Sequence, residues 1–292
     1  MIDPHHKKCH LCDRPLSNNK TKYCPQCSSF APRLYRLPHK AAKAVRKYIR
    51  KHGYVCYYTG MLLDLRDPHS PWYCVFDHWR PHDPHKIVLT SSLLNDMKSD
   101  LTESEFWSMI RQLAAHRCRH TKIRKIKLSC WDRDYSNKDL GVVEGDVPAW
   151  DTKKCDGTCH ICGKRIKGAH SRYCSPCAVL AHRIHMEKVP IQTIKNLWDY
   201  IRKHGLVCYY TGMPLVVDDS RSPWYFQFDH WRPHDPGKLV LTSALINDMK
   251  SDLSEEEFWY YILQFANYKD NGTKVRKRSL AYWCRLTPVE DI

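Results

Sequence analysis

An internal repeat constrains the fold of this chain more than any other feature. Residues 51–101 and 203–253 align at a constant offset of 152 and differ at 13 of 51 positions. Similarity this close indicates two copies of one folding unit, and the repeat is too long to be a solenoid element. The 292 residues are enough for two domains of ordinary size. We expect the copies to be joined around 137–154, where Gly and Pro interrupt the apolar periodicity.

The charge of the chain is strongly basic. Lys and Arg outnumber Asp and Glu by 47 to 31, a formal net charge of +16. A basic protein that binds no polyanion can show such an excess, but here the basic residues gather at related places in both copies, which favours a polyanionic partner. The clusters are Lys40–Lys51, Arg117–Lys127 and Lys274–Arg278.

The sequence gives no sign of a membrane span or of a secretion signal. No apolar run approaches the roughly 20 residues that cross a bilayer. Residues 1–8 are polar and lack the apolar core of a signal peptide. We therefore expect an intracellular, reducing location.

Eight of the 15 cysteines form two quartets, each made of two Cys-x2-Cys pairs. Two such knuckles can offer four thiolates to a tetrahedral Zn2+, and a reducing compartment disfavours the alternative of disulfides or redox pairs. A four-thiolate site has no open coordination position, so we expect two structural zinc ions per chain and no catalysis there. The ligands are Cys9, Cys12, Cys24 and Cys27 in the first quartet, and Cys159, Cys162, Cys174 and Cys177 in the second.

Each copy shows the same order of predicted elements. Pro38, apolar residues at three- to four-residue spacing and Gly53 predict a short amphipathic helix, basic on its polar face in the first copy. The segments 72–79 and 85–91 are rich in aromatic and β-branched residues and predict two strands, with a Pro-containing loop between them. A helix follows from residue 92, with a break and a new helix start near Thr102.

This strand–loop–strand–helix order places three polar residues close together. Asp77 and His78 end the first strand, and Asn95 lies in the first turns of the helix packed against it. Carboxylate and amide oxygens suit Mg2+, while a neutral His78 remains free to act as a general base. Hydrolysis of a phosphodiester needs such a base together with a metal that stabilises the leaving oxygen.

The motif VFDHWRP followed by KIVLTSSLLNDMKSD resembles the HNH, or ββα-metal, endonuclease family, especially the HNH domain of type II CRISPR effector nucleases. The preceding Cys56–Gly60, with its Tyr-Thr-Gly, resembles the start of that domain. The resemblance covers about 45 residues of each repeat, without guide-binding lobes. It implies DNA cleavage to 5′-phosphate and 3′-hydroxyl ends, with Asp77 and Asn95 as metal ligands and His78 as base. In the second copy these roles fall to Asp229, Asn247 and His230.

The chain departs from the family at its middle position, often an Asn that braces the loop. The nearby residues are His82, His85 and Lys86, or His234, Gly237 and Lys238, and none is a clear equivalent.

Several other residues are candidates for nucleic-acid contact. Phosphate binding and simple solvation are about equally compatible with the loop residues, whereas basic segments beside a nuclease centre favour phosphate contact over solvated edge strands. The candidates are Arg80, Arg232, Lys122, Arg124, Lys125, Lys274, Arg276 and Lys277, with His82 and His234 nearby. Trp79, Trp107 and their counterparts are predicted to be core residues rather than base-stacking platforms. Lys98 and Lys250 are predicted to lie on the helix surface and pair with local aspartates.

The sequence as a whole predicts an α+β fold of two tandem repeats, each a zinc module followed by a ββα-metal nuclease domain. The expected boundaries are 1–37, 38–136, 155–189 and 190–292, with a linker at 137–154. We expect a monomeric, Mg2+-dependent endonuclease with internal pseudo-twofold symmetry that cuts both strands of double-stranded DNA. By family analogy alone, its setting is a homing or mobile element. The alternatives are a non-cleaving zinc-dependent nucleic-acid binder, and a nickase or a structure- or RNA-specific nuclease.

Overall fold

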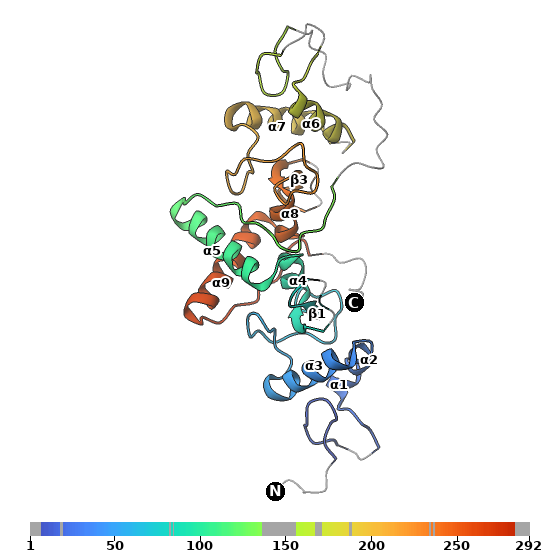
Figure 1. Cartoon of the computed structure of the whole chain (residues 1–292). Coiled ribbons are helices and arrows are strands. Elements are labelled where there is room, and N and C mark those ends of the chain that lie inside the picture. Colours follow the sequence, from blue (N-terminus) through green and yellow to red (C-terminus); the bar gives the residue numbers. More distant parts are fainter. Residues whose placement is uncertain are drawn as a thin grey trace. The chain divides into compact units, whose positions relative to one another are not determined.

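The computed structural model describes residues 7–17, 20–81, 83, 85–135, 156–166, 171–186, 189–233, 235 and 237–283. The predicted linker at 137–154 lies outside these residues, as do His82 and His234. The described part confirms the α+β fold with two repeated units, each a four-cysteine cluster, a β-hairpin and a following helix (Figure 1).

The first copy begins with its cysteine cluster and three helices. These are α1 (Pro25–Ser28), α2 (Ala31–Tyr35) and α3 (His39–His52). The hairpin β1 (Cys74–His78) and β2 (Ile87–Ser91) follows, and α4 (Ser92–Lys98) and α5 (Glu103–Arg119) come next. Gly53 ends α3 with φ 78°, a positive value that glycine adopts without a steric penalty.

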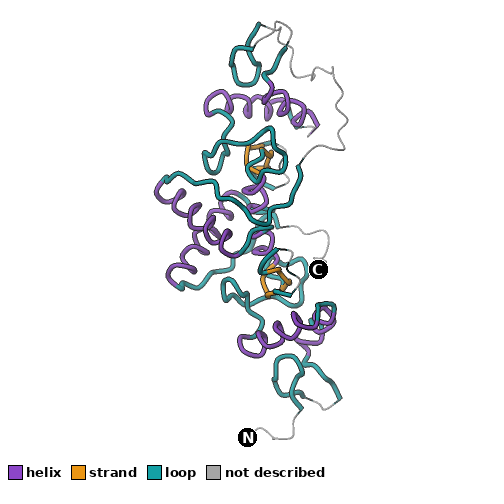
Figure 2. The backbone as a smooth tube through the Cα atoms, viewed as in Figure 1, coloured by secondary structure: helices purple, strands orange, loops and turns teal. Residues whose placement is uncertain are grey.

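The second copy repeats this order, with one continuous helix, α6, in the place of α1 and α2. Its elements are α6 (Ser175–Met186), α7 (Ile191–His204), β3 (Phe226–His230), β4 (Leu239–Ser243), α8 (Ala244–Lys250) and α9 (Glu255–Asn271). Figure 2 shows the two hairpins as separate pairs of strands, and the described residues form no other sheet.

The hairpin register places the end of β1 against the start of β2. The strands are antiparallel, with Phe76 opposite Leu89 and Asp77 opposite Val88. Ser91 then caps α4 by accepting a hydrogen bond from the N–H of Leu94 at 3.3 Å, so the chain turns directly from strand into helix. The counterpart in the second copy is Ser243, which accepts from Ile246 at 3.4 Å.

The predicted break between α4 and α5 is confirmed, and a capping box begins the second helix. The N–H of Thr102 donates to the Glu105 carboxylate at 2.8 Å, and the N–H of Glu105 donates back to the Thr102 hydroxyl at 3.3 Å. Glu105 also accepts from the N–H of Ser129 at 2.7 Å, which ties the basic segment after α5 to the start of that helix.

The chain forms two compact units, and each contains residues from both sequence repeats. Unit 1 joins Met1–Ala114 and Ile126–Cys130 to Glu257–Ile292, and unit 2 joins Ala115–Lys125 to Trp131–Glu256. Within unit 1, the ring of Tyr261 from α9 packs against Trp72 at 5.5 Å. We call Ala115–Lys125 and Glu257–Ile292 the closing segments of the first and second repeat. Each closing segment belongs to the unit that contains most of the other repeat.

Equivalent contacts hold these exchanged segments in both units. In unit 1 the Lys277 ammonium lies 5.5 Å from the centre of the Trp72 ring, and in unit 2 the Lys125 ammonium lies 6.0 Å from that of Trp224. Lys277 is the counterpart of Lys125 in the repeat, and Trp72 is the counterpart of Trp224. The same contact therefore holds the exchanged segment in each unit.

Candidate functional site

The two cysteine quartets have the geometry of tetrahedral thiolate sites. In each quartet the four sulfurs lie within 4.8 Å of one another, and the Sγ atoms of Cys12 and Cys24 are 3.7 Å apart, as are those of Cys162 and Cys174. Four sulfurs about 2.3 Å from one Zn2+ in a tetrahedron are about 3.8 Å apart, whereas a disulfide needs about 2.05 Å. The quartets therefore fit two structural zinc ions, as the sequence predicts.

Two sulfurs of the first quartet accept hydrogen bonds. The N–H of Cys24 donates to Cys9 Sγ at 3.4 Å and the Tyr54 hydroxyl donates to Cys27 Sγ at 3.0 Å. Although burial acts in the opposite direction, backbone N–H groups lower the pKa of the Cys9 thiol to about 6. A thiol that ionises near neutral pH is ready to bind a metal. Burial raises the pKa of the Cys24 and Cys27 thiols, so this readiness belongs to Cys9 and not to the whole quartet. The second copy has Leu206 in place of Tyr54, so its quartet lacks that hydroxyl.

A second site lies where the β1–β2 hairpin meets α4. Asp77, the fourth residue of β1, is only 5% exposed, and both of its carboxylate oxygens have partners. Oδ1 is 3.1 Å from the ammonium of Lys98, and Oδ2 accepts a hydrogen bond from the Tyr58 hydroxyl at 2.5 Å. The Lys98 ammonium also donates to the backbone oxygen of His78 at 3.1 Å.

The second copy reproduces this arrangement. Asp229 is 7% exposed and lies 3.1 Å from the Lys250 ammonium, while the Tyr210 hydroxyl donates to it at 2.6 Å. Lys250 also donates to the backbone oxygen of His230 at 3.1 Å. Because the same four groups meet in both units, the arrangement belongs to the repeat.

The prediction that Lys98 and Lys250 lie on the helix surface is wrong. Lys98 is 1% exposed and Lys250 is fully buried, and each pairs with the strand aspartate rather than with a neighbour on its own helix. The physical reason is that each lysine stands on the helix face packed against the hairpin. A buried ammonium there needs an anion, and the aspartate at the end of β1 or β3 supplies it.

Burial controls the ionisation of this pair. It raises the pKa of Asp77 above the usual value, although the positive charge of Lys98 and the Tyr58 hydrogen bond act in the opposite direction. Burial, together with the negative charge of Asp77, also raises the pKa of Tyr58. Asp229 and Tyr210 shift in the same directions for the same reasons. Tyr58 and Tyr210 therefore remain protonated hydrogen-bond donors at neutral pH.

The predicted base and second metal ligand lie beside this pair. His78 ends β1 and is half-buried, and Asn95 on α4 is half-buried as well. Asn95 precedes Lys98 by one helical turn, which puts the two on the same side of α4. Because Lys98 contacts Asp77 and the backbone of His78, that side of the helix faces the end of the strand. Asn95 therefore stands on the side of α4 that faces the end of β1, where Asp77 and His78 follow one another.

The donor set suits a hard divalent cation in type, but one group competes with it. Each carboxylate oxygen has two lone-pair positions, and one on each oxygen of Asp77 is already used. The other lone pairs and the amide oxygen of Asn95 are oxygen ligands of the kind that Mg2+ binds. The Lys98 ammonium 3.1 Å from Oδ1 repels any cation at that carboxylate, so binding requires the ammonium to withdraw or to be outweighed.

The tryptophans next to the site are held by structural contacts. The indole N–H of Trp79 donates to Glu103, and that of Trp231 donates to Glu255. Trp107 is buried in the core of unit 1. The guanidinium of Arg80 is exposed and lies 5.4 Å from the centre of the Trp79 ring. The predicted core position is confirmed for Trp107 and Trp259, whereas Trp79 and Trp231 are only half-buried, and Arg80 is accessible.

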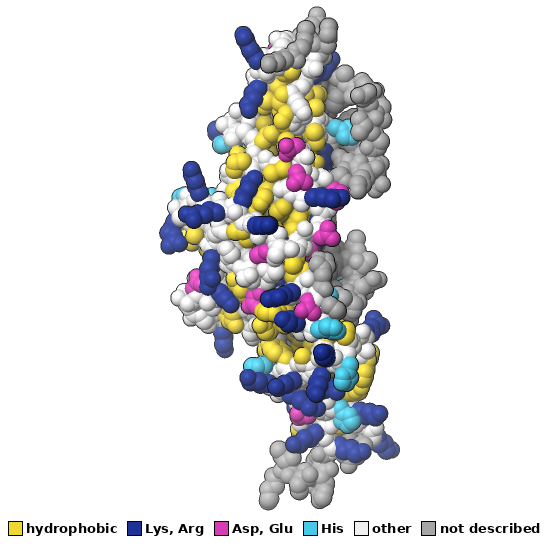
Figure 3. All heavy atoms as spheres, viewed as in Figure 1, with side chains coloured by type: hydrophobic (Ala, Val, Ile, Leu, Met, Phe, Trp, Pro, Cys, Tyr) yellow, Lys and Arg dark blue, Asp and Glu magenta, His cyan; other side chains and the backbone are white. Residues whose placement is uncertain are grey.

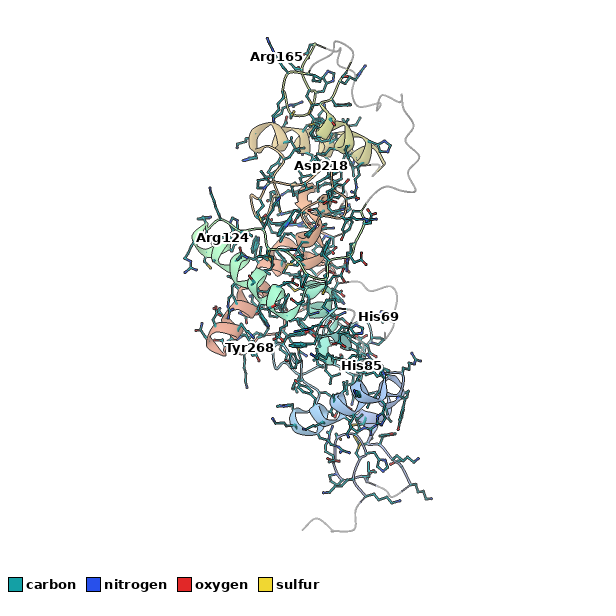
Figure 4. The ribbon with its side chains drawn as sticks, in the orientation of Figure 1. His69, His85, Arg124, Arg165, Asp218 and Tyr268 are labelled. Carbon is teal, nitrogen blue, oxygen red and sulfur yellow. The ribbon has the colours of Figure 1, made fainter. Side chains whose placement is uncertain are left out.

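The loop between the strands offers no bracing residue of the expected kind. His85, labelled in Figure 4, is exposed, and its backbone N–H donates to the Asp83 side chain at 3.0 Å. The turn is therefore shaped by an aspartate rather than by an asparagine at the middle position of the motif.

The predicted phosphate-contact segments have mixed surroundings. In 122–125 the lysines and Arg124 (Figure 4) are exposed around the buried Ile123, and in 274–277 the basic residues are exposed around the buried Val275. Lys125 and Lys277 lie over tryptophan rings, so part of their role is structural. The more accessible cations are Lys122, Arg124, Lys274 and Arg276, and Arg232 is exposed beside Trp231.

Sequence reasoning missed the tyrosines and lysines that hold each aspartate. Tyr58 and Lys98 lie in strings that are identical in the two copies, and this identity is the one signal that marks them. Identity alone does not pair them, because the pair forms only when α4 packs on the hairpin.

Comparisons with models of protein families, with curated proteins and with solved structures found no match to this chain. Within the described residues, no helix is long and apolar enough to cross a membrane.

Proposed function

We propose that this chain is a metal-dependent DNA endonuclease with two HNH-type centres. The observation that carries the proposal is the placement of Asp77 and His78 at the end of a hairpin strand, with Asn95 on the helix that follows, repeated in the second copy. A ββα unit that presents a carboxylate, an imidazole and an amide together can support phosphodiester hydrolysis.

In the proposed reaction the His78 imidazole accepts a proton from water as the water oxygen bonds to phosphorus. The bond from phosphorus to the 3′ oxygen breaks and that oxygen takes a proton from solvent, giving a 5′-phosphate and a 3′-hydroxyl. A divalent cation held by Asp77 and Asn95 would stabilise the charge on the leaving oxygen. Lys98 and Tyr58 do not touch the substrate in this scheme. They fix the orientation of Asp77, and Lys98 also fixes the backbone of His78.

The surface charge supports a polyanionic substrate. The chain carries a formal net charge of +16, and the exposed residues of the closing segments place cations in both units. Contacts of this kind bind the backbone without reading sequence, and they make affinity dependent on salt. Two centres in one chain would allow double-strand cleavage without a homodimer.

The contact between Lys98 and Asp77 favours a second candidate, a zinc-dependent nucleic-acid binder that does not cleave. In that case the ammonium would permanently occupy the place of the cation, and the ββα unit would serve only as a scaffold. Binding to DNA without any cleavage is the result that this alternative predicts.

A plasmid assay separates the two candidates. With Mg2+, we expect the chain to convert supercoiled plasmid into linear product, and His78→Ala or His230→Ala alone to give open circles. Loss of a general base costs about 10²- to 10⁴-fold in rate, so the double variant should leave the plasmid intact. If both single variants still linearise the plasmid as fast as the original chain, the assignment of one centre per strand is wrong. Retarded but uncut plasmid supports the binder.

A further inference from the structure

Helix α3 presents a row of four lysines on one side. Lys40, Lys43, Lys47 and Lys51 follow one another at spacings of three, four and four residues, which places them on a single face of the helix. All four are exposed. In Figure 3 the Lys and Arg side chains gather around the position that α3 occupies in Figure 1. Eleven residues of helix span about 16 Å, so the row is a linear array of charge.

The other faces of α3 already have structural roles. Ala41, Val45 and Ile49 are buried in unit 1. Arg50 donates to the backbone oxygen of His10 at 3.0 Å and pairs with Asp13 at 3.2 Å, so it fastens the helix to the zinc module. Throughout the described part of the chain, by contrast, the lysine row takes part in no ion pair or side-chain hydrogen bond.

The row is unfavourable for the helix itself. It contains three pairs of like charges at spacings of three or four residues, and each such pair destabilises a helix. The first turn carries no acidic residue that would compensate. A bound polyanion would attract all four lysines and offset the repulsion between them.

The second copy keeps the structural contact and lacks the row. On α7 the corresponding positions are Gln192, Lys195, Asp199 and Lys203, so the face carries a charge of +1 (two lysines and one aspartate) instead of +4. Asp199 is itself paired with Arg202 at 2.9 Å. Arg202 donates to the backbone oxygen of His160, which is the equivalent of the contact made by Arg50. The contact with the cysteine module is therefore kept in both copies, while the charge of the outer face differs.

We infer that the Lys40–Lys43–Lys47–Lys51 face of α3 is a docking surface for the phosphate backbone of double-stranded DNA, and that α7 provides no such surface. The identity of the polyanion as DNA rests on the proposed function. We assign the row to phosphates rather than bases, because lysine ammoniums act as point charges and no aromatic or amide side chain on the same face adds base specificity. The two copies then differ in duty: unit 1 anchors the duplex through α3, and unit 2 does not use the equivalent helix.

The test compares two variants with the same change in net charge. The first replaces Lys40, Lys43, Lys47 and Lys51 with Gln. The matched control replaces four exposed cations of the second zinc module and α7, which are Lys164, Arg165, Lys195 and Lys203. Binding to a short fluorescent duplex is measured by anisotropy between about 50 and 200 mM salt, without added divalent cation, so that no cleavage takes place. Zinc content and circular dichroism establish that both variants are folded.

Each lost phosphate contact lowers the slope of log K against log salt by about 0.9. We expect the α3 variant to lose about 3 to 4 from the slope, and the control to lose less than about 1. A version with Arg at the four α3 positions should keep the original slope. Equal slopes for the α3 variant and the control would overturn the inference.

The failure of this inference and the failure of the proposed function give different results. If the chain cuts plasmid but the α3 variant keeps the slope, the nuclease proposal stands and the docking surface is wrong. If the slope falls as expected and no cleavage occurs, the surface stands and the nuclease proposal is wrong.

Discussion

The buried pair of Asp77 and Lys98 makes the sharpest prediction about stability. Replacing Lys98 with Met keeps most of the volume of the side chain but leaves the carboxylate 5% exposed without its cation. Breaking a buried ion pair by removing one partner costs about 3–5 kcal/mol, because an uncompensated charge remains. We expect a loss of this size in unit 1. The double variant Asp77→Asn, Lys98→Met should recover most of it, because no charge is then buried alone.

The pH dependence of this loss has a defined sign. Burial raises the folded-state pKa of Asp77 above its ordinary value of 3.8, and the charge of Lys98 opposes that shift. Without Lys98 the folded-state pKa rises further, so ionisation of Asp77 destabilises the fold over a wider range as the pH increases. The difference in stability between the original chain and Lys98→Met should therefore be smaller near about pH 4 than near about pH 7.

Hydrogen exchange read by mass spectrometry provides an internal control for this experiment. Amides of 74–91 report on unit 1, and amides of 226–243 report on unit 2, where the pair of Asp229 and Lys250 is unchanged. We expect the free energy of exchange to fall by about 3–5 kcal/mol in 74–91 and to stay constant in 226–243. A loss below about 1 kcal/mol in 74–91, or a double variant as unstable as Lys98→Met, would refute the reasoning.

Three further predictions follow from other contacts. Tyr54→Phe should weaken zinc binding by the first quartet about 10- to 100-fold in a chelator competition and leave the second quartet unchanged, because Leu206 replaces the tyrosine there. Hydrogen bonds from Thr102 and Ser129 outweigh burial and lower the pKa of Glu105, so Glu105→Gln should destabilise the chain at neutral pH and progressively less as the pH falls below 4.5, as measured by urea unfolding. Fragments 1–136 and 137–292 should each be less protected from proteolysis than the whole chain and regain protection when mixed, because each unit draws residues from both fragments; equal resistance before and after mixing would contradict this.

Local features of the sequence are sufficient to predict most of the fold. Pro38 and Gly53 mark the ends of α3, aromatic and β-branched residues mark the strands, and Thr102 with Glu105 marks the start of α5. Cysteine spacing is sufficient for the two four-cysteine clusters. Each of these signals depends on residues a few positions apart, where geometry follows from the backbone alone.

The ion pair at the candidate site could not be predicted in this way. Lys98 has aspartates two positions away on either side, and helix rules favour surface pairing with such neighbours. Its partner Asp77 is 21 residues away, and the pair depends on how α4 packs on β1. Only the tertiary contact decides whether the ammonium is buried.

The exchange of closing segments was also beyond the sequence, for a different reason. Lys125 and Lys277 occupy equivalent positions, as do Trp72 and Trp224. Either lysine satisfies either tryptophan equally well, so the pattern of residue types is the same for the exchanged and unexchanged arrangements. Chain connectivity and tertiary packing decide between the two arrangements, and local sequence patterns predict neither of these.

The exchange also restricts how the two copies can diverge. A redundant duplicate usually can be lost, but here deletion of either repeat would strip the survivor of the segment that completes it. A residue that holds an exchanged segment must suit both repeats, which fits the identity of Trp72 and Trp224 and of Lys125 and Lys277. The outer faces of α3 and α7 do not hold the exchanged segments, and there the two copies differ in charge. Such a chain cannot lose one repeat without destabilising the other, but the outer surface of one repeat can acquire a separate role.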